Sequence, residues 1–267
     1  MATARATIAL FAALALALAL AVAGADARPC ALSRESVEGA YPAFCGKFPC
    51  PPFTVNADRP GFEVRTYAPG TYVATTVKGS SYSMAYTRAV SRLYRYFNGG
   101  NYEGVSLNQT APLFSLLLWG DDGPVATEPA PASLSARSAA AGPGERPVDG
   151  TLKNYAFAYW LPPERQSDPP MPADDAVKIV SVPESVLFVK VFGGYAPEPQ
   201  LEKQANLLSS ALIADGTSAW DDGFGGLVYD GPAKIFGRHN EVAAFEVDPR
   251  SNYTALVHAI ADGVSAQ

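Results

Sequence analysis

The sequence is poor in the residues that most often carry chemistry near neutral pH. Its 267 residues include two histidines, His239 and His258, and three cysteines, and acidic side chains outnumber basic ones by 26 to 20. Two histidines leave little acid–base chemistry near pH 7 without large pKa shifts. Three cysteines exclude a zinc site of four thiolates. The net charge of −6 argues against nucleic acid binding, which needs many Lys and Arg contacts to phosphates.

Catalytic motifs are also missing. The sequence contains no Gly-x-Ser-x-Gly elbow, no His-Glu-x-x-His pair and no phosphate-binding loop. Four glutamates could form carboxylate pairs after folding, but we expect them to be solvated surface groups: Glu63, Glu103, Glu184 and Glu241. The residues therefore do not indicate an enzyme.

The N-terminus has the features of a secretory signal peptide. The unbroken apolar run Ile8–Ala23 follows Arg5 and precedes Ala25-Asp26-Ala27, a small-x-small cleavage pattern. The run is shorter than the ~20 residues that a membrane-spanning helix needs. We predict that residues 1–27 are removed and that the mature chain begins near Arg28. The protein is then secreted or lies in the lumen of the secretory pathway, with no membrane span.

The three cysteines lie together in a Pro- and Cys-rich arm at 28–60, for which we expect an extended conformation tied by a disulfide. In an oxidising compartment two of Cys30, Cys45 and Cys50 pair, and the sequence does not say which two. The third is free or intermolecular. The dipeptide Cys50-Pro51 also occurs in thiolate haem ligation, but a disulfide partner is the favoured interpretation of Cys50.

Two sequons, at Asn108 and Asn252, become glycosylation sites if the chain is secreted. Asn108 lies inside a dense apolar pattern, which suggests that it is enclosed. Asn252 is therefore the better candidate for modification.

Regular structure is expected to begin at Gly61. "FEVRTYAPGTYVATTV" alternates apolar and polar residues on both sides of Ala68-Pro69-Gly70, which predicts two short strands joined or bent at a turn. A helical period follows and ends at Asn98-Gly99-Gly100. One face of this helix is apolar and a second stripe is basic: Tyr82, Tyr86, Val90, Leu93 and Phe97, then Arg88, Arg92 and Arg95.

The next strand pair is predicted at Val105–Trp119 and Asn154–Leu161. The segment 121–150 between them is rich in Pro, Ala, Gly and Ser and lacks aromatic residues. Such a composition cannot bury a core, so we predict a disordered insertion in a hairpin.

The second half of the chain repeats the first. "VKIVSVPESVLFVKVFGGY" aligns with "FEVRTYAPGTYVATTVKGS", so that Val64 meets Ile179 and Leu93 meets Leu208. Each half therefore has two strands, a helix and two more strands, and its exposed apolar sheet face requires the other half. We predict one α+β domain at 61–250, a pseudo-twofold antiparallel sheet or distorted barrel with two helices outside, and a C-terminal tail at 251–267.

Several segments resemble the SOUL family of haem-binding proteins. They are "FGGYAPEPQLEKQANLLSSAL", "YWLPPERQSDPPMPADDAVKI", "YDGPAKIFGRHNEV" and the opening "FEVRTYAPGTYVAT". The resemblance implies a duplicated βαββ-type fold that forms a distorted antiparallel barrel. It also implies non-catalytic binding of haem or a free porphyrin in a shallow apolar cleft beside the first helix, without an obligatory axial residue, as in a carrier or scavenger.

A porphyrin needs apolar surfaces under its ring and basic groups near its two carboxylates. The first helix offers Val90, Leu93 and Tyr94 beside Arg88 and Arg92, and Lys234 matches a basic position in the closing loop of the family. The alternatives are a solvated helix face for the arginines and core packing for the apolar residues. His239 stands where the family generally has arginine, so we expect an exposed turn residue, not an iron ligand.

Two other functions remain open. An enzyme on the same barrel would need a buried, pKa-perturbed acid in the cleft. A protein-interaction module would use the "PPMP" segment and the insertion.

Overall fold

A computed structural model describes residues 41–118, 153–219 and 223–246, all within one structural unit that begins at Tyr41. The predicted signal peptide, Cys30, the insertion at 121–150, the tail at 251–267 and the sequon at Asn252 lie outside the described residues. No helix among the described residues combines the length and the apolar character needed to cross a bilayer.

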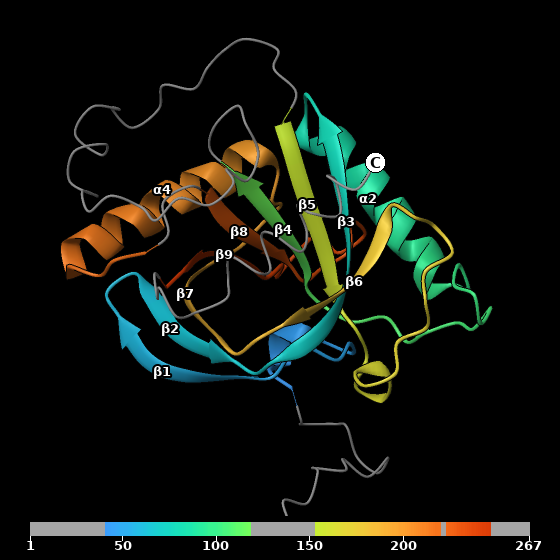
Figure 1. Ribbon diagram of the computed structural model, residues 1–267. Coiled ribbons are helices and arrows are strands. Elements are labelled where there is room, and N and C mark those ends of the chain that lie inside the picture. Colours follow the sequence, from blue (N-terminus) through green and yellow to red (C-terminus); the bar gives the residue numbers. More distant parts are fainter. Residues whose placement is uncertain (1–40, 119–152, 220–222, 247–267) are drawn as a thin grey trace, which may run out of the picture. The chain divides into compact units, whose positions relative to one another are not determined.

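The strands form one antiparallel sheet, which is curled into a half-barrel (Figure 1). Their order across the sheet is β1-β2-β7-β9-β8-β4-β5-β3-β6. The strands are β1 (Phe53–Arg59), β2 (Phe62–Tyr67), β3 (Gly70–Gly79), β4 (Leu113–Leu118), β5 (Lys153–Trp160), β6 (Val177–Val182), β7 (Ser185–Phe192), β8 (Gly223–Val228) and β9 (Asn240–Phe245). The helices are α2 (Tyr82–Phe97) and α4 (Glu198–Asp215), with short 3-10 turns η1 (Ala43–Cys45) and η2 (Pro163–Arg165).

The sheet order confirms the internal repeat. The unit β2-β3-α2-β4-β5 corresponds to β6-β7-α4-β8-β9, and exchanging each strand for its counterpart reverses the order β2-β7-β9-β8-β4-β5-β3-β6 onto itself. A pseudo-twofold axis therefore passes between β4 and β8, which pair directly. The predicted α+β class and the distorted barrel with two outer helices are confirmed, and β1 extends the sheet beyond the repeat.

Three details differ from the sequence-based expectation. Regular structure begins before Gly61, because Phe53–Arg59 pairs with β2 as an edge strand. The strands on either side of Ala68-Pro69 do not pair with each other: β2 pairs with β1 and β7, and β3 pairs with β5 and β6.

The strand predicted from Val105 begins only at Leu113. The side chain of Asn101 closes a loop after α2 instead, since its Nδ2 donates to the carbonyl of Val105 (2.8 Å) and its Oδ1 accepts from the Val105 amide (3.1 Å). An amide side chain that satisfies backbone groups in this way competes with strand pairing.

Each face of the sheet has its own core. Val73 and Val77 of β3 pack with α2 in the core of the outer face, which also includes residues of α4, while Ala74 faces the other way. The inner face is covered in part by the N-terminal arm, in which Cys45 and Cys50 form a disulfide and are buried. This pair confirms that two of the three cysteines bond.

Helix α2 begins and ends where its sequence predicts. Its buried residues recur at spacings of three and four: Tyr82, Ala85, Ala89, Leu93, Tyr96 and Phe97. The helix ends before Gly99, which has a φ of 90°, a conformation that favours glycine. A side chain on Gly100 would meet the carbonyl oxygen of Arg95 at 2.7 Å, so the tight turn requires that glycine as well.

Candidate functional site

Helix α2 has two flanks with different chemistry. The flank toward β5 is aromatic: the Tyr86 ring lies edge-on to Phe157 at a centroid distance of 6.1 Å, and Phe97 lies edge-on to Tyr159 at 5.7 Å. Val90 and Tyr94 follow Tyr86 at intervals of four residues, which places them along the same flank. We call this side of the helix the tyrosine flank.

The opposite flank, toward β3 and β6, carries the arginines. Arg92 donates to the carbonyl of Thr76 at 3.2 Å and to the hydroxyl of Thr75 at 3.4 Å. Arg95 pairs with Asp174 at 3.2 Å. Arg88 is exposed and makes no ion pair or hydrogen bond within the described part of the chain. Much of the basic stripe thus fastens α2 to β3 and to the segment before β6.

The predicted site residues are therefore divided. Val90 and Tyr94 lie on the tyrosine flank, whereas Arg88 and Arg92 lie on the arginine flank. Leu93 is fully buried between helix and sheet, so it exposes no surface to a ligand. Val90 is half-buried against the core, and Tyr94 is 55% exposed.

Lys234 lies in the loop between β8 and β9, which is organised around Arg238. The guanidinium of Arg238 donates to three carbonyls, each at 2.7 Å: those of Asp230, Gly231 and Lys234. It also stacks over the ring of Tyr195 at 4.5 Å. This cross-linked loop holds Ile235 and Phe236 in solvent, 64% and 84% exposed.

Electrostatics link this loop to the tyrosine flank. Burial raises the pKa of Tyr86, and the positive charge of Arg238 opposes that rise. Burial also raises the pKa of Tyr159, with a contribution from Tyr86. Together the loop and the flank carry apolar and aromatic side chains, one exposed cation, Lys234, and the buried Arg238. We call this set of residues the tyrosine face: Tyr86, Val90, Tyr94, Tyr159, Lys234, Ile235, Phe236 and Arg238.

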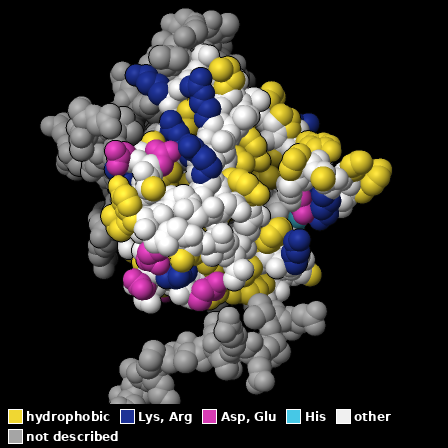
Figure 2. Space-filling view, turned by 90° about the vertical axis from the view of Figure 1, so that its right-hand side faces the viewer, with side chains coloured by type: hydrophobic (Ala, Val, Ile, Leu, Met, Phe, Trp, Pro, Cys, Tyr) yellow, Lys and Arg dark blue, Asp and Glu magenta, His cyan; other side chains and the backbone are white. Residues whose placement is uncertain are grey.

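Figure 2 views the side of the molecule that carries α2. Lys and Arg side chains gather on one part of it, and hydrophobic side chains lie next to them.

Within the loop between β8 and β9, Lys234 pairs with Asp230 at 2.8 Å. Burial of Asp230 raises its pKa, but the hydrogen bonds from Lys234 and the His239 amide outweigh this effect and lower the pKa overall.

A buried polar cluster was not predicted. Arg65 of β2 and Glu241 of β9 lie 2.9 Å apart, with 2% and 0% of their side chains exposed. The hydroxyl of Tyr229 donates to the other carboxylate oxygen at 2.9 Å. The interpretation of Glu241 as a surface carboxylate was wrong.

The expectation for His239 as an exposed turn residue was wrong as well. Its ring stacks on Phe44 at a centroid distance of 4.1 Å, and its Nε2 lies 2.7 Å from Glu241 Oε1. The N-terminal arm supplies Phe44. The arm covers the inner face of the sheet, which the alternation of apolar and polar residues in β2 had indicated to be exposed to solvent. No local signal in the sequence reports this coverage.

The described residues contain no group of three or more His, Cys, Asp or Glu side chains that could hold a metal ion. Glu241 is occupied by Arg65, Tyr229 and His239, which leaves no free carboxylate for acid–base work there. The tyrosine face offers surface and charge instead. It can bind a flat apolar ligand with anionic groups.

The fold defines a class of duplicated α+β half-barrels with two outer helices. The family model described as SOUL heme-binding protein matches residues 48–245, and the chain belongs to that family. It is 31% identical to "Heme-binding protein 1" of Xenopus tropicalis over 186 residues, covering 69% of this chain and 83% of that protein. It is 27% identical to human "Heme-binding protein 2" over 185 residues, covering 69% and 78%.

Solved structures are less similar. The C-terminal domain of EcmrR aligns with a TM-score of 0.44 and 8% identity, covering 68% of this chain and 94% of that one. A hydrolase from Listeria innocua aligns with a TM-score of 0.41 and 11% identity, covering 71% of this chain and 93% of that one.

Proposed function

We propose that this protein binds a tetrapyrrole, haem or a free porphyrin, on the tyrosine face and does not act as an enzyme. The observation that carries the proposal is the pairing of exposed apolar side chains, Ile235 and Phe236, with the exposed cation Lys234 in one loop. A porphyrin is a flat apolar plate with carboxylates at one edge. Family membership and the names of the relatives support the same ligand.

The residues of the face fit such a ligand. Tyr86 and Val90 are half-buried and Tyr94 is exposed, so they offer a shallow apolar wall along the helix. Ile235 and Phe236 provide the opposing contact. Carboxylates at the ring edge can pair with Lys234, whose side chain is 46% exposed, whereas Arg238 is buried and holds the loop by donating to three carbonyls.

An axial protein ligand is not required by this arrangement. His239 Nε2 is already engaged by Glu241, and its ring is stacked on Phe44, so the imidazole serves the buried cluster. We propose that contact with the ring and its carboxylates provides the affinity. Metal-free porphyrin should then bind as haem does.

Arg88 and Arg92 were predicted at the same site, and they remain testable. A ring on the tyrosine flank is separated from them by the body of α2, so their charges contribute little in our proposal. Lys234→Glu should weaken haemin binding, measured by absorption titration, by about tenfold, because it replaces attraction to a carboxylate by repulsion. Lys203→Glu is the control, because it makes the same change in net charge at an exposed position of α4, and it should leave haemin affinity unchanged.

Arg88→Glu distinguishes the two flanks. If Arg88→Glu weakens haemin binding and Lys234→Glu does not, the ring lies on the arginine flank and the proposed placement is wrong. If no variant changes a clear binding curve, neither flank holds the ring.

We also propose that the protein acts after secretion as a carrier or scavenger. The Cys45–Cys50 disulfide supports an oxidising compartment, where such bonds persist. N-terminal sequencing of protein from a eukaryotic secretory host should find a chain that begins near Arg28. A retained Met1 would contradict the proposed secretion and leave the ligand proposal unaffected.

A further inference from the structure

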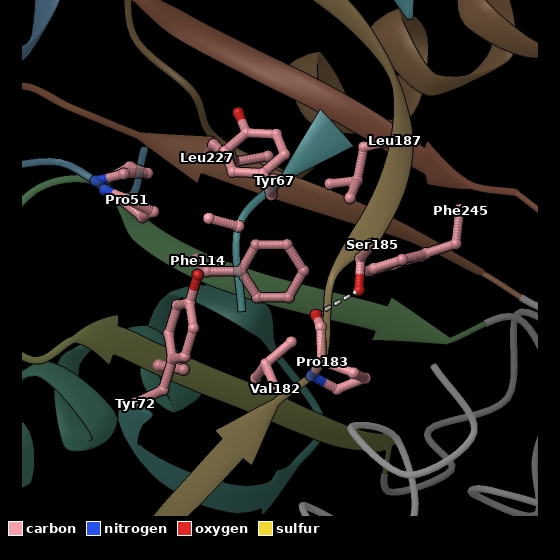
Figure 3. Close-up of a pocket in the computed structure, with 13 residues that line it drawn as sticks. Pro51, Tyr67, Tyr72, Phe114, Val182, Pro183, Ser185, Leu187, Leu227 and Phe245 are labelled. Carbon is pink, nitrogen blue, oxygen red and sulfur yellow. Dashed lines mark hydrogen bonds between the residues drawn. The ribbon is translucent and has the colours of Figure 1, made fainter. Parts of the chain in front are cut away.

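A second apolar groove lies on the inner face of the sheet, away from α2 and α4. Figure 3 shows side chains from several strands converging on it, among them Tyr67, Tyr72, Phe114, Leu187 and Phe245. The groove has a volume of about 620 Å³, which includes open solvent at its mouth. Tyr72 and Val73 are neighbours in β3 and therefore point to opposite faces of the sheet: Val73 points to the helices and Tyr72 to the inner face.

None of the side chains that line the groove carries a charge at neutral pH. Besides the five named above they are Pro51, Ala68, Pro112, Ala158, Val182, Pro183, Ser185 and Leu227. The hydroxyl of Ser185 is occupied, since it donates to the carbonyl of Pro183 at 3.0 Å. An anionic ligand such as a porphyrin with two carboxylates would find no counter-charge here, so this groove differs in chemistry from the tyrosine face.

Tyr72 contributes a hydroxyl group to the groove. The hydroxyl of Tyr72 makes no hydrogen bond within the described residues, although its side chain is half-buried among apolar groups. The neighbouring Tyr67 hydroxyl, in contrast, accepts from Arg65 at 3.4 Å. Burial raises the pKa of Tyr72, so it stays protonated and able to donate at neutral pH. Because Tyr72 is only half-buried, water can meet its hydroxyl in the open groove, and a ligand with an acceptor at this position would take the place of that water.

We propose that this groove is a second ligand site, which takes a neutral apolar small molecule with one hydrogen-bond acceptor placed at the Tyr72 hydroxyl. The uncharged walls select against ions, the aromatic and aliphatic side chains bury the body of the ligand, and Tyr72 orients its acceptor. The sheet separates this site from the tyrosine face, so both ligands bind together.

The test uses the full mature chain and two neutral fluorescent probes: Prodan, which carries a carbonyl acceptor, and diphenylhexatriene, which has no polar atom. Prodan should bind saturably with a blue-shifted emission, and saturating haemin should not raise its Kd. Tyr72→Phe removes only the hydroxyl and should weaken Prodan by about three- to tenfold while leaving diphenylhexatriene unchanged. Val182→Trp, at the end of edge strand β6, fills the groove and should weaken both probes.

Three results would overturn the proposal. They are the absence of saturable Prodan binding, equal effects of Tyr72→Phe on both probes, and Prodan binding that Val182→Trp leaves unchanged in protein with a wild-type urea midpoint.

The C-terminal tail is the alternative occupant, because β9 ends at Phe245 in the groove wall and the tail carries Leu256 and Ile260 at a helical spacing. Prodan binding that becomes much tighter in Leu256→Asp/Ile260→Asp would assign the groove to the tail.

Discussion

The guanidinium of Arg65 lies 2.9 Å from the carboxylate of Glu241, and this buried contact joins β2 of the first half to β9 of the second across 176 positions of sequence. Arg65 also pairs with Glu63 at 2.7 Å and stacks over Phe53 at 4.5 Å. The cluster thus ties both halves of the sheet to β1 and the N-terminal arm.

Breaking this pair should be costly. Glu241→Leu leaves Arg65 buried without its main counter-charge, and we expect the free energy of unfolding to fall by about 3–5 kcal/mol in urea titrations. Arg65→Met/Glu241→Leu removes both charges and should recover a large part of that loss. A single variant that loses less than about 1 kcal/mol would show that the contact does not hold the halves together.

His239→Ala separates a structural role from iron ligation. The substitution removes the stack on Phe44, so hydrogen exchange in residues 41–52 should accelerate and stability should fall by about 0.5–1.5 kcal/mol. The Soret band and the haemin affinity should stay as in the wild type. A shifted Soret band with unchanged exchange in the arm would identify His239 as a ligand.

The lowered pKa of Asp230 predicts that the stability of the protein depends on pH. Its pKa is lowered in the folded state, so the carboxylate contributes stability above its unfolded pKa of about 3.9, and that contribution is lost as the pH falls through the folded pKa. Asp230→Asn should therefore be less stable than the wild type at pH 7, and the two urea midpoints should converge as the pH falls below the folded-state pKa of Asp230. A difference that persists unchanged at low pH would contradict this origin.

The single described disulfide leaves one cysteine over. Alkylation without reduction, followed by peptide mass spectrometry, should find Cys45 linked to Cys50 and label on Cys30 if that thiol is free. A disulfide-linked dimer through Cys30 would show the intermolecular alternative. A Cys30–Cys50 peptide would contradict the observed pairing.

Periodic patterns predicted most of the fold. The helix at Tyr82–Phe97 and the match of Val64 with Ile179 follow from spacing and repetition, and the sheet order reproduces the repeat strand by strand. Strand partners could not be predicted in the same way. The alternation in β2 and β3 specifies faces, but it carries no information on which distant strand supplies the hydrogen bonds.

The sequence could name candidate binding residues only by the element that carries them. A list of residues in α2 does not say which flank of the helix each one occupies, and Leu93 proved to be part of the core. Arg238 stood out least, since its role depends on three carbonyls that the loop brings together only after folding. Asn108, expected to be enclosed, is exposed and donates to Glu164 at 2.7 Å, because the strand around it does not form.

The most direct test of the account is a pair of equilibrium titrations of the mature protein, one with haemin and one with metal-free protoporphyrin IX, followed by absorption and tryptophan fluorescence. We predict saturable binding of both at a single tyrosine face, with Kd values within about threefold, and a parallel loss of affinity for both in Lys234→Glu. Flat curves at micromolar ligand would contradict tetrapyrrole binding, and binding of haemin alone would contradict a ring held without an axial ligand.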